Sequence, residues 1–210
     1  MDKGESIGGV HIPVLTKEIL NNMRIVPGSV VVDATADGGG HTTAFAKAVG
    51  SSGTVISIEW DEEMVRFLSE RIAQEHLANT VKVIQGNFKE IEEIVTKEGF
   101  RAVDGVLFDF GFSSFHVDLS GRGFTFRKNE PLDMRYSQAT KLTARDVVNT
   151  YPEKELAYII KSYGEERFAR QIAEAIVKER QRRPIMTTLE LVAVIAKGIP
   201  SGFRRKKIHF

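Results

Sequence analysis

Acidic and glycine residues stand in this sequence where short apolar runs end. Asp33 closes the run VVVD, and Gly38, Gly39 and Gly40 follow it directly before a helical pattern. Adjacent glycines let the backbone turn tightly and approach a ligand, and the helix N-terminus behind them offers N–H groups. The pattern is neither G-x-G-x-x-G nor a phosphate-binding loop with its Lys, which argues against NAD pyrophosphate and against ATP. A glycine-rich turn without a ligand is the alternative.

Three further apolar runs end in groups that could hold a nucleoside. Glu59 ends TVISIE about 20 residues after the glycines, where adenosine-binding sheets accept hydrogen bonds from ribose hydroxyls. Asn87 and Phe88 follow VKVIQG, and the ring of Phe88 could flank an adenine or belong to the core. Asp109 ends VLFD and, if it is buried, needs a hydrogen-bonding partner. Together these groups predict a nucleoside cofactor site with an acid at its centre.

The elements that must position these groups alternate over the first half of the chain. Strands are expected at residues 30–34, 54–60, 81–86 and 103–110, and helices at residues 41–50, 61–76 and 88–99. This alternation indicates a parallel sheet with right-handed crossovers, whose ligands bind beyond the carboxyl ends of the strands. Four strands are few for such a sheet, so we expect either a fragment or an unusually small sheet.

The second half is predicted to be helical, with no strand between the helices. Thr143 with Asp146, and Thr187 with Glu190, have the spacing of helix capping boxes. The apolar stripes of this half, interpreted as ordinary core, are Leu156, Ile159, Ile160 and Tyr163, then Phe168, Ile172 and Ile176. We therefore expect a separate helical domain or insertion.

Composition and charge limit the class of protein. The chain has 210 residues, 42% hydrophobic and 27% charged, which is typical of a globular protein. It has no Cys, no apolar run of signal-peptide type and no stretch of eighteen apolar residues, so a cytoplasmic protein without disulfides is expected. Nothing in the sequence indicates a catalytic metal.

The net charge of +1 conceals an uneven distribution. Residues 1–120 hold 10 Lys and Arg against 18 Asp and Glu, a net charge of −8, whereas residues 121–210 hold 19 against 10, a net charge of +9. A basic half beside an acidic half suggests that the basic part contacts a polyanion. The alternative is that these basic side chains simply form the solvated faces of helices.

Five ordered segments carry a resemblance to a known family. They are HIPVLTKEIL, DATADGGGHT, VDGVLFDFGFSS, RGFTFRKNEPLDMR and YGEERFARQIAEAIVKER. With these segments the chain resembles, from His11 to Phe210, the RsmH (MraW) family of S-adenosylmethionine-dependent methyltransferases. The resemblance implies methyl transfer from S-adenosylmethionine to N4 of a cytidine in the decoding region of 16S ribosomal RNA, with the small ribosomal subunit as partner.

The resemblance also implies site residues and shows three departures. Cofactor contacts are expected at Gly39, Gly40, His41, Glu59, Phe88, Asp109 and His116. The family usually has Gly at Asp37, Asp at Glu59 and Gln at His116. Glu59 keeps a carboxylate on a longer side chain, Asp37 adds a negative charge, and His116 adds a group that titrates near neutral pH. We expect cofactor binding to be retained.

The resemblance implies a domain division and a missing part. The expected fold is a Rossmann-like class I methyltransferase sheet, incomplete in this chain, with a second, helical domain. Residues 1–118 are expected to form the cofactor-binding core, 119–142 a hinge, 143–205 the helical substrate-recognition domain, and 206–210 the start of the missing remainder. A non-catalytic fragment that binds cofactor or RNA is one alternative and a NAD-binding oxidoreductase another; the oligomeric state is open, a dimer included.

Within the long segment from Asp109 to Arg135, residues Asp109 to Ser114 are expected to form the wall between methyl donor and target base. The remainder is expected to be the hinge into the basic helical domain. Asp109 is the hypothesised catalytic residue, holding either the target amine or the amino-acid end of the cofactor, with the backbone carbonyls of Phe110 and Gly111 as the alternative acceptors of the amine. A base that undergoes chemistry must be unstacked, and aromatic rings and Arg planes are its usual supports. The candidates for RNA contact are Phe112, Arg127, Arg135, Arg167 and Arg170. For Phe124 and Phe126, packing onto the core is the favoured interpretation.

Overall fold

The computed structural model describes residue 13 and residues 15–203. The first residues of the resemblance, from His11, and the predicted segment 206–210 lie outside the described residues. The chain divides into two compact units. They are Met1–Phe115 with Tyr136–Gln138, and His116–Arg135 with Ala139–Phe210.

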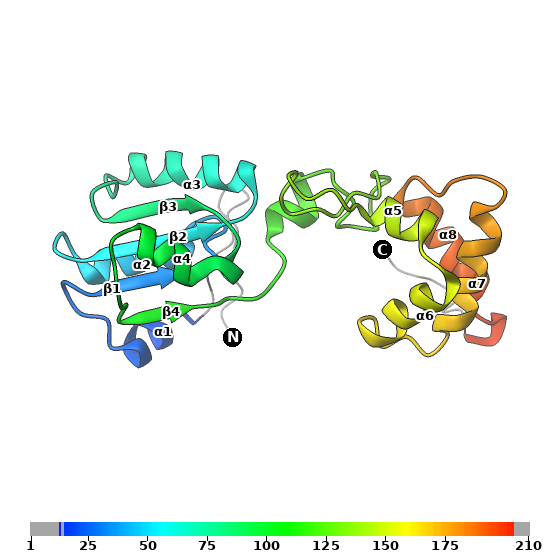
Figure 1. The fold of residues 1–210 in the computed structure, drawn as a ribbon, viewed down its shortest axis with the longest axis horizontal. Helices are drawn as coiled ribbons and strands as arrows, with labels where there is room; N and C mark the ends of the chain where they lie inside the picture. Colours follow the sequence, from blue (N-terminus) through cyan, green and yellow to red (C-terminus); the bar gives the residue numbers. More distant parts are fainter. Residues whose placement is uncertain (1–12, 14, 204–210) are drawn as a thin grey trace. The chain divides into compact units, whose positions relative to one another are not determined.

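The first unit is built on a parallel sheet, which confirms the expected α/β fold. Its strands are β1 (Val30–Asp33), β2 (Thr54–Glu59), β3 (Val81–Gln85) and β4 (Gly105–Leu107). All pairings are parallel, and Figure 1 shows the strands side by side in the order β3-β2-β1-β4. The carboxyl ends of all four strands therefore lie at one edge, where the sequence predicted the ligand groups.

Helices cover both faces of this sheet. They are α1 (Thr16–Met23), α2 (Gly40–Val49), α3 (Glu62–Gln74) and α4 (Ile91–Lys97), with a 3-10 turn η1 (Phe88–Glu90) before α4. Val31 packs with α2 and α3 in one buried cluster, whereas its neighbour Val32 packs with Ile94 of α4 in another. Successive side chains of β1 thus enter opposite cores, as the period of a strand requires. This double burial explains the continuous apolar runs of the inner strands.

The fourth strand is shorter than the sequence predicted. Its ladder ends at Leu107, because the N–H of Asp109 donates to Thr35 Oγ1 at 2.8 Å instead of to the neighbouring strand. β4 is also an edge of the four-stranded sheet, and Phe108 and Phe110 beyond it are exposed. The expected strand at residues 103–110 is therefore too long at both ends, and Val106 within β4 is itself 38% exposed.

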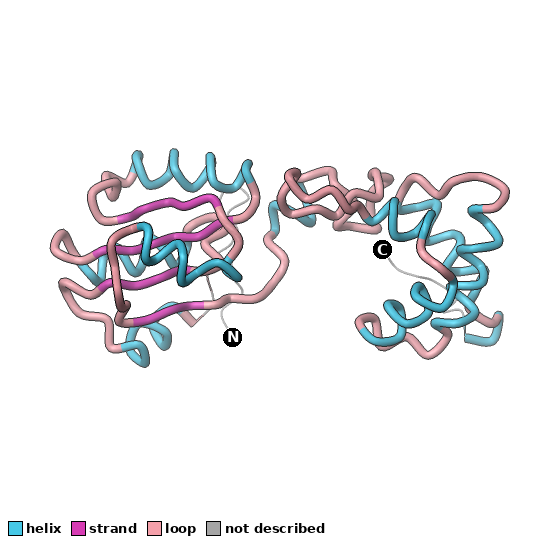
Figure 2. The backbone as a smooth tube through the Cα atoms, viewed as in Figure 1, coloured by secondary structure: helices cyan, strands magenta, loops and turns pink. Residues whose placement is uncertain are grey.

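The second unit contains helices and loops, and no strand among its described residues (Figure 2). Its helices are α5 (Ala144–Thr150), α6 (Glu153–Ser162), α7 (Ala169–Arg180) and α8 (Thr188–Gly198). Both expected capping boxes are confirmed, at Thr143 with Asp146 and at Thr187 with Glu190. The remaining short elements are η2 (Phe115–Leu119), which begins in the first unit, and η3 (Ser201–Phe203).

The core of the second unit confirms most of the apolar stripes. Leu156, Ile172 and Ile176 are buried together, and Ile160 and Phe168 pack against them. Tyr163 is the exception, because it is 79% exposed. α6 ends at Ser162, and the chain then turns through Glu165 with a φ of 51°, so Tyr163 lies outside the helical stripe.

Among the described residues, no helix has the length and apolar character that crossing a membrane requires.

Candidate functional site

The carboxyl group of Asp33 lies fully buried at the end of β1. It accepts hydrogen bonds from Thr42 Oγ1 at 2.7 Å and, at 3.4 Å, from the N–H of Thr35. Burial raises its pKa to about 6, and the charges of Asp109 and Asp37 also raise it. The folded state therefore favours the protonated form of Asp33, and its ionised form lowers the stability of the fold.

Glu59, at the end of β2, is buried and held by backbone donors. Its Oε1 accepts the N–H groups of Trp60 and Asp61 at 2.7 and 2.8 Å, and its Oε2 accepts that of Asp37 at 2.8 Å. Burial raises the pKa of Glu59 despite these bonds, and the charge of Asp37 raises it further. A carboxylate has about four lone-pair sites, so roughly one remains for a ligand.

The glycine turn has a structural reason in conformation and packing. Gly39 precedes α2 with a φ of 80°, and a Cβ there would collide with Leu68. A Cβ at Gly40 would lie 2.6 Å from Cδ of Pro13. Conformation and packing thus require both glycines. In addition, no side chain caps the N-terminus of α2, whereas Asp61 caps α3.

Asp109 lies at the open side of this edge. Its side chain is 43% exposed, and its Oδ2 is 3.5 Å from Nε2 of the buried His41 in the first turn of α2. Its backbone N–H is held by Thr35, whose own N–H is held by Asp33. Asp33 at the end of β1 and Asp109 beyond β4 are thus joined by hydrogen bonds through a single residue, Thr35.

Aromatic rings complete the same edge. Phe88 contacts Phe108 and Phe110 with ring centroids 5.8 and 5.6 Å apart. β3 and β4 are the two outer strands, and these ring contacts bring together the segments that follow them beyond the carboxyl edge of the sheet. Phe112, 68% exposed, stacks on Tyr136 at 6.5 Å.

Tyr136 was not predicted from the sequence to belong to this site. It returns to the first unit after the chain has passed through part of the second, and its hydroxyl donates to the carbonyl of Gly111 at 3.4 Å. Burial raises its pKa, as do the charges of Glu59, Asp37 and Asp61. No sequence pattern marks this return, although Ser137 next to it fixes the contact by donating to Glu62 at 2.6 Å.

The structure assigns the expected residues to both units. The cofactor candidates Gly39, Gly40, His41, Glu59, Phe88 and Asp109 all belong to the first unit, with the RNA candidate Phe112. His116 belongs to the second unit, where it is buried against Phe124 with ring centroids 5.1 Å apart. The packing interpretation thus fits Phe124, but it is wrong for Phe126, which is 54% exposed.

The RNA candidates of the second unit differ in their contacts. Arg135 is bound to Asp133 at 2.7 Å and to the carbonyl of Thr140 at 2.9 Å, so it has a structural role. Arg167 is exposed between the rings of Phe168 and Phe203, with its guanidinium carbon 4.7 and 4.3 Å from their centroids. Arg127 and Arg170 are exposed.

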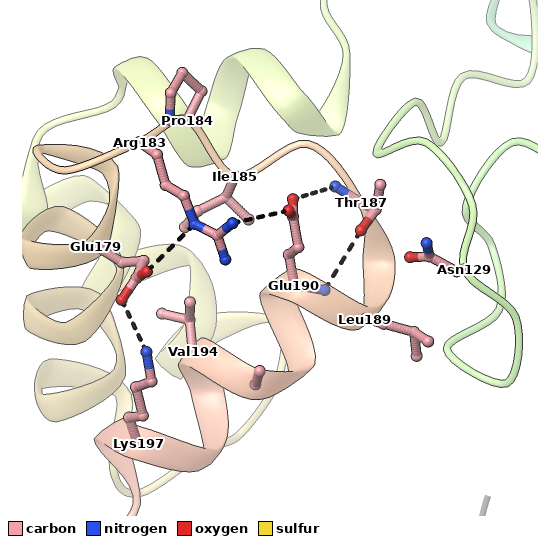
Figure 3. Close-up of a pocket in the computed structure, with 11 residues that line it drawn as sticks. Asn129, Glu179, Arg183, Pro184, Ile185, Thr187, Leu189, Glu190, Val194 and Lys197 are labelled. Carbon is pink, nitrogen blue, oxygen red and sulfur yellow. Dashed lines mark hydrogen bonds and ion pairs between the residues drawn. The ribbon is translucent and has the colours of Figure 1, made fainter.

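The second unit also has a cavity of about 360 Å³ between α7, α8 and the loop joining them (Figure 3). Lys197 reaches Glu179 at 2.9 Å, and Arg183 lies 3.8 Å from both Glu179 and Glu190. Asn129 contributes from the long segment before α5. The charges of this cavity are paired with one another, and none of the expected site residues lines it.

Comparison with known proteins gives a consistent family. Residues 9–210 match the model of the MraW methylase family. Ribosomal RNA small subunit methyltransferase H of Carboxydothermus hydrogenoformans is 43% identical over 94% of this chain and 62% of its own length. The protein of the same name from Brevibacillus brevis is 41% identical over 95% of this chain and 63% of its own length. The chain thus spans less than two thirds of these relatives.

Likeness among solved structures is weaker. An S-adenosylmethionine-dependent O-methyltransferase from Thermotoga maritima superposes with a TM-score of 0.36 and 25% identity, over 45% of this chain and 33% of that one. The parallel sheet and the family match, rather than this superposition, therefore assign the fold.

Proposed function

The chain belongs to the MraW methylase family, and on that premise we propose that the whole protein transfers a methyl group from S-adenosylmethionine to ribosomal RNA of the small subunit. The finer proposal is that the acceptor is N4 of a cytidine in the decoding region of 16S ribosomal RNA. The small ribosomal subunit is the partner that this proposal requires, in the cytoplasm.

The charges of the strand-end site fit a cationic nucleoside. The charges of Asp109 and Asp37 raise the pKa of Asp33, and the charge of Asp37 raises that of Glu59, so these four acids lie close together. Such a group of carboxyl groups repels a pyrophosphate and attracts a sulfonium and an ammonium. Glu59 and Asp37 offer acceptors for hydroxyl groups, and the uncapped N-terminus of α2 offers N–H donors for a carboxylate.

When bound, S-adenosylmethionine supplies an electrophilic methyl group. The residues proposed to hold it are those around the glycine turn: Gly39, Gly40, His41, Glu59 and Phe88. Cofactor contact at His116 is proposed from the family resemblance alone, because the ring of His116 lies in the second unit.

Asp109 is proposed as the catalytic residue. The amine of cytosine is a poor nucleophile because its lone pair is delocalised into the ring. An acceptor on an amine hydrogen favours localisation of that lone pair, and alignment of the amine supplies part of the rate. Asp109 suits this role because its side chain is partly exposed while Thr35 fixes its backbone.

The exposed aromatic and basic side chains are proposed to receive the RNA. Phe112 would stack on an unstacked base, and Arg127, Arg167 and Arg170 would contact phosphates. Arg135 is the weakest of these candidates, since Asp133 already pairs with it.

The family match together with four acidic groups at one sheet edge carries the proposal. Its test is methyl transfer by the full-length protein from methyl-labelled S-adenosylmethionine to small ribosomal subunits and to naked 16S RNA, followed by nucleoside mass spectrometry. We expect N4-methylcytidine. Label in another nucleoside would overturn the N4 assignment, and absence of label from both RNA substrates would overturn the activity.

A further inference from the structure

Asp37 occupies an unfavourable position in the glycine turn. Its φ is 44°, in the left-handed region where a residue with a Cβ is strained and glycine is not. Its Oδ1 is buried and, among the described residues, has no hydrogen-bond donor. A strained backbone and an unsatisfied carboxylate oxygen both disfavour Asp here, so the fold alone does not account for it.

The hydrogen bond that Asp37 makes to its neighbour does not account for it either. The bond to Oε2 of Glu59 comes from the backbone N–H of Asp37, at 2.8 Å. A glycine at position 37 would keep that N–H, relieve the strain and remove the unsatisfied oxygen. No described residue supplies a donor to this oxygen of the Asp37 carboxylate, and a bound ligand would supply one.

The position of Asp37 indicates what that partner is. Glu59, beside it, already accepts three backbone N–H groups and has roughly one lone-pair site left. A ribose presents two adjacent hydroxyl groups, which need two acceptors. The charge of Asp37 raises the pKa of both Glu59 and Tyr136, so its carboxylate lies close to them.

We propose that Asp37 and Glu59 divide the ribose diol of the bound nucleoside between them, Oδ1 of Asp37 accepting one hydroxyl and the carboxylate of Glu59 the other. This inference rests on the proposed function, because it assumes an S-adenosyl ligand at this edge. It makes Asp37 a binding residue that discriminates ribose from deoxyribose.

The test is calorimetric titration of the 210-residue chain with S-adenosylhomocysteine and with its 2′-deoxy and 3′-deoxy analogues. The variant is Asp37→Gly, which keeps the backbone bond to Glu59. The matched control is His76→Gly, because His76 is an exposed residue of the same unit that also has a left-handed φ, of 57°. Thermal melting of each protein follows its stability.

For the unaltered chain, removal of the hydroxyl that Asp37 accepts is expected to weaken binding about tenfold. In Asp37→Gly, S-adenosylhomocysteine is expected to bind about tenfold more weakly, and removal of that same hydroxyl to have no further effect. Both Asp37→Gly and His76→Gly are expected to melt at a higher temperature than the unaltered chain. His76→Gly is expected to bind S-adenosylhomocysteine with unchanged affinity.

Two results would overturn the inference while the proposed function stands. One is an Asp37→Gly protein that binds S-adenosylhomocysteine as tightly as the unaltered chain. The other is an Asp37→Gly protein that binds S-adenosylhomocysteine more weakly but loses further affinity, by equal factors, when either hydroxyl is removed. That result would mean that the Asp37 carboxylate of the unaltered chain binds neither hydroxyl. If the folded, unaltered chain binds no S-adenosyl ligand, the proposed function fails and the inference fails with it.

Discussion

The acids at the edge of the sheet and the acids of the helical unit are held in opposite ways. Burial raises the pKa of Asp33 and of Glu59, although both accept hydrogen bonds. In the helical unit, hydrogen bonds from Arg135, Thr143 and Lys197 lower the pKa of Asp133, Asp146 and Glu179. The helical unit therefore stabilises the ionised form of its carboxyl groups, whereas the sheet edge destabilises the ionised form of Asp33 and Glu59.

This difference separates structural groups from groups available to a ligand. A carboxylate in a capping box or an ion pair contributes to folding and has few lone pairs to spare. A buried carboxylate with a raised pKa gains when a cation or a hydroxyl donor arrives. The contrast therefore points to the strand ends, rather than to the charged cavity of the helical unit, as the place of chemistry.

The largest expected effect is on methyl transfer at Asp109. Asp109→Ala in the full-length protein is expected to lower the transfer rate about 100-fold, because the target amine loses its acceptor. Single-turnover transfer to small subunits measures this rate, and Asp118→Ala, an exposed Asp of the helical unit, is the control. Unchanged transfer and unchanged cofactor affinity in Asp109→Ala would contradict the assignment.

The next effect is on stability at Asp33. Its pKa of about 6, against 3.8 for an ordinary Asp, means that the folded state binds the proton more tightly. Proton binding by Asp33 contributes about 3 kcal/mol to the free energy of unfolding. This contribution is fully present below about pH 4 and is lost as the pH rises through 6. Asp33→Asn is therefore expected to unfold at a higher urea concentration at pH 7 and to show a smaller pH dependence between pH 4 and 6.

Asp146→Asn provides the opposite case for the same urea experiment. The Thr143 hydroxyl lowers the pKa of Asp146, so its contribution is present above pH 3.8 and lost as the pH falls through the lowered pKa. Asp146→Asn is expected to be less stable than the unaltered chain at pH 7. The contrast between the two regions fails if both Asn variants shift stability in the same direction.

A smaller effect is expected at the cap of α5. Thr143→Ala removes the hydroxyl that accepts the N–H of Asp146 and donates to its carboxylate. It is expected to cost about 1 kcal/mol of unfolding free energy and to leave the affinity for S-adenosylmethionine unchanged. Urea unfolding and calorimetry on the same sample measure the two quantities, and a loss of affinity would show that the helical unit takes part in cofactor binding.

The smallest effect concerns two of the arginine candidates for RNA contact, Arg170 and Arg135. Arg170→Ala is expected to reduce the slope of log affinity against log salt by about 0.7 with single-stranded RNA, and to leave the melting temperature unchanged. Arg135→Ala is expected to lower the melting temperature, because Asp133 loses its partner. Filter binding at several salt concentrations measures the slope, and equal slopes for Arg170→Ala and the unaltered chain would remove Arg170 from the interface.

The sequence predicted the sheet well because its inner strands are buried on both faces. The runs ending at Asp33 and Glu59 fall within one residue of the observed strands. It also predicted the two capping boxes, since their spacing is local. The bounds of the edge strand β4 and the exposure of Tyr163 were predicted wrongly, because burial there depends on which neighbours lie alongside.

The site was only partly predictable for the same reason. Asp37 and Glu59 were separate departures from the family pattern, and the structure joins them by a hydrogen bond of 2.8 Å. Tyr136 reaches the first unit through a return of the chain that follows no periodic pattern. Contacts between residues far apart in the sequence, such as these, can be recognised only once the fold is known.

The central claim is that the strand ends form a site for a cationic nucleoside. Calorimetric titration of the 210-residue chain with S-adenosylmethionine and with NAD tests it most directly. We expect saturable binding of S-adenosylmethionine and no binding of NAD at the same concentrations. Tight binding of NAD alone would contradict it.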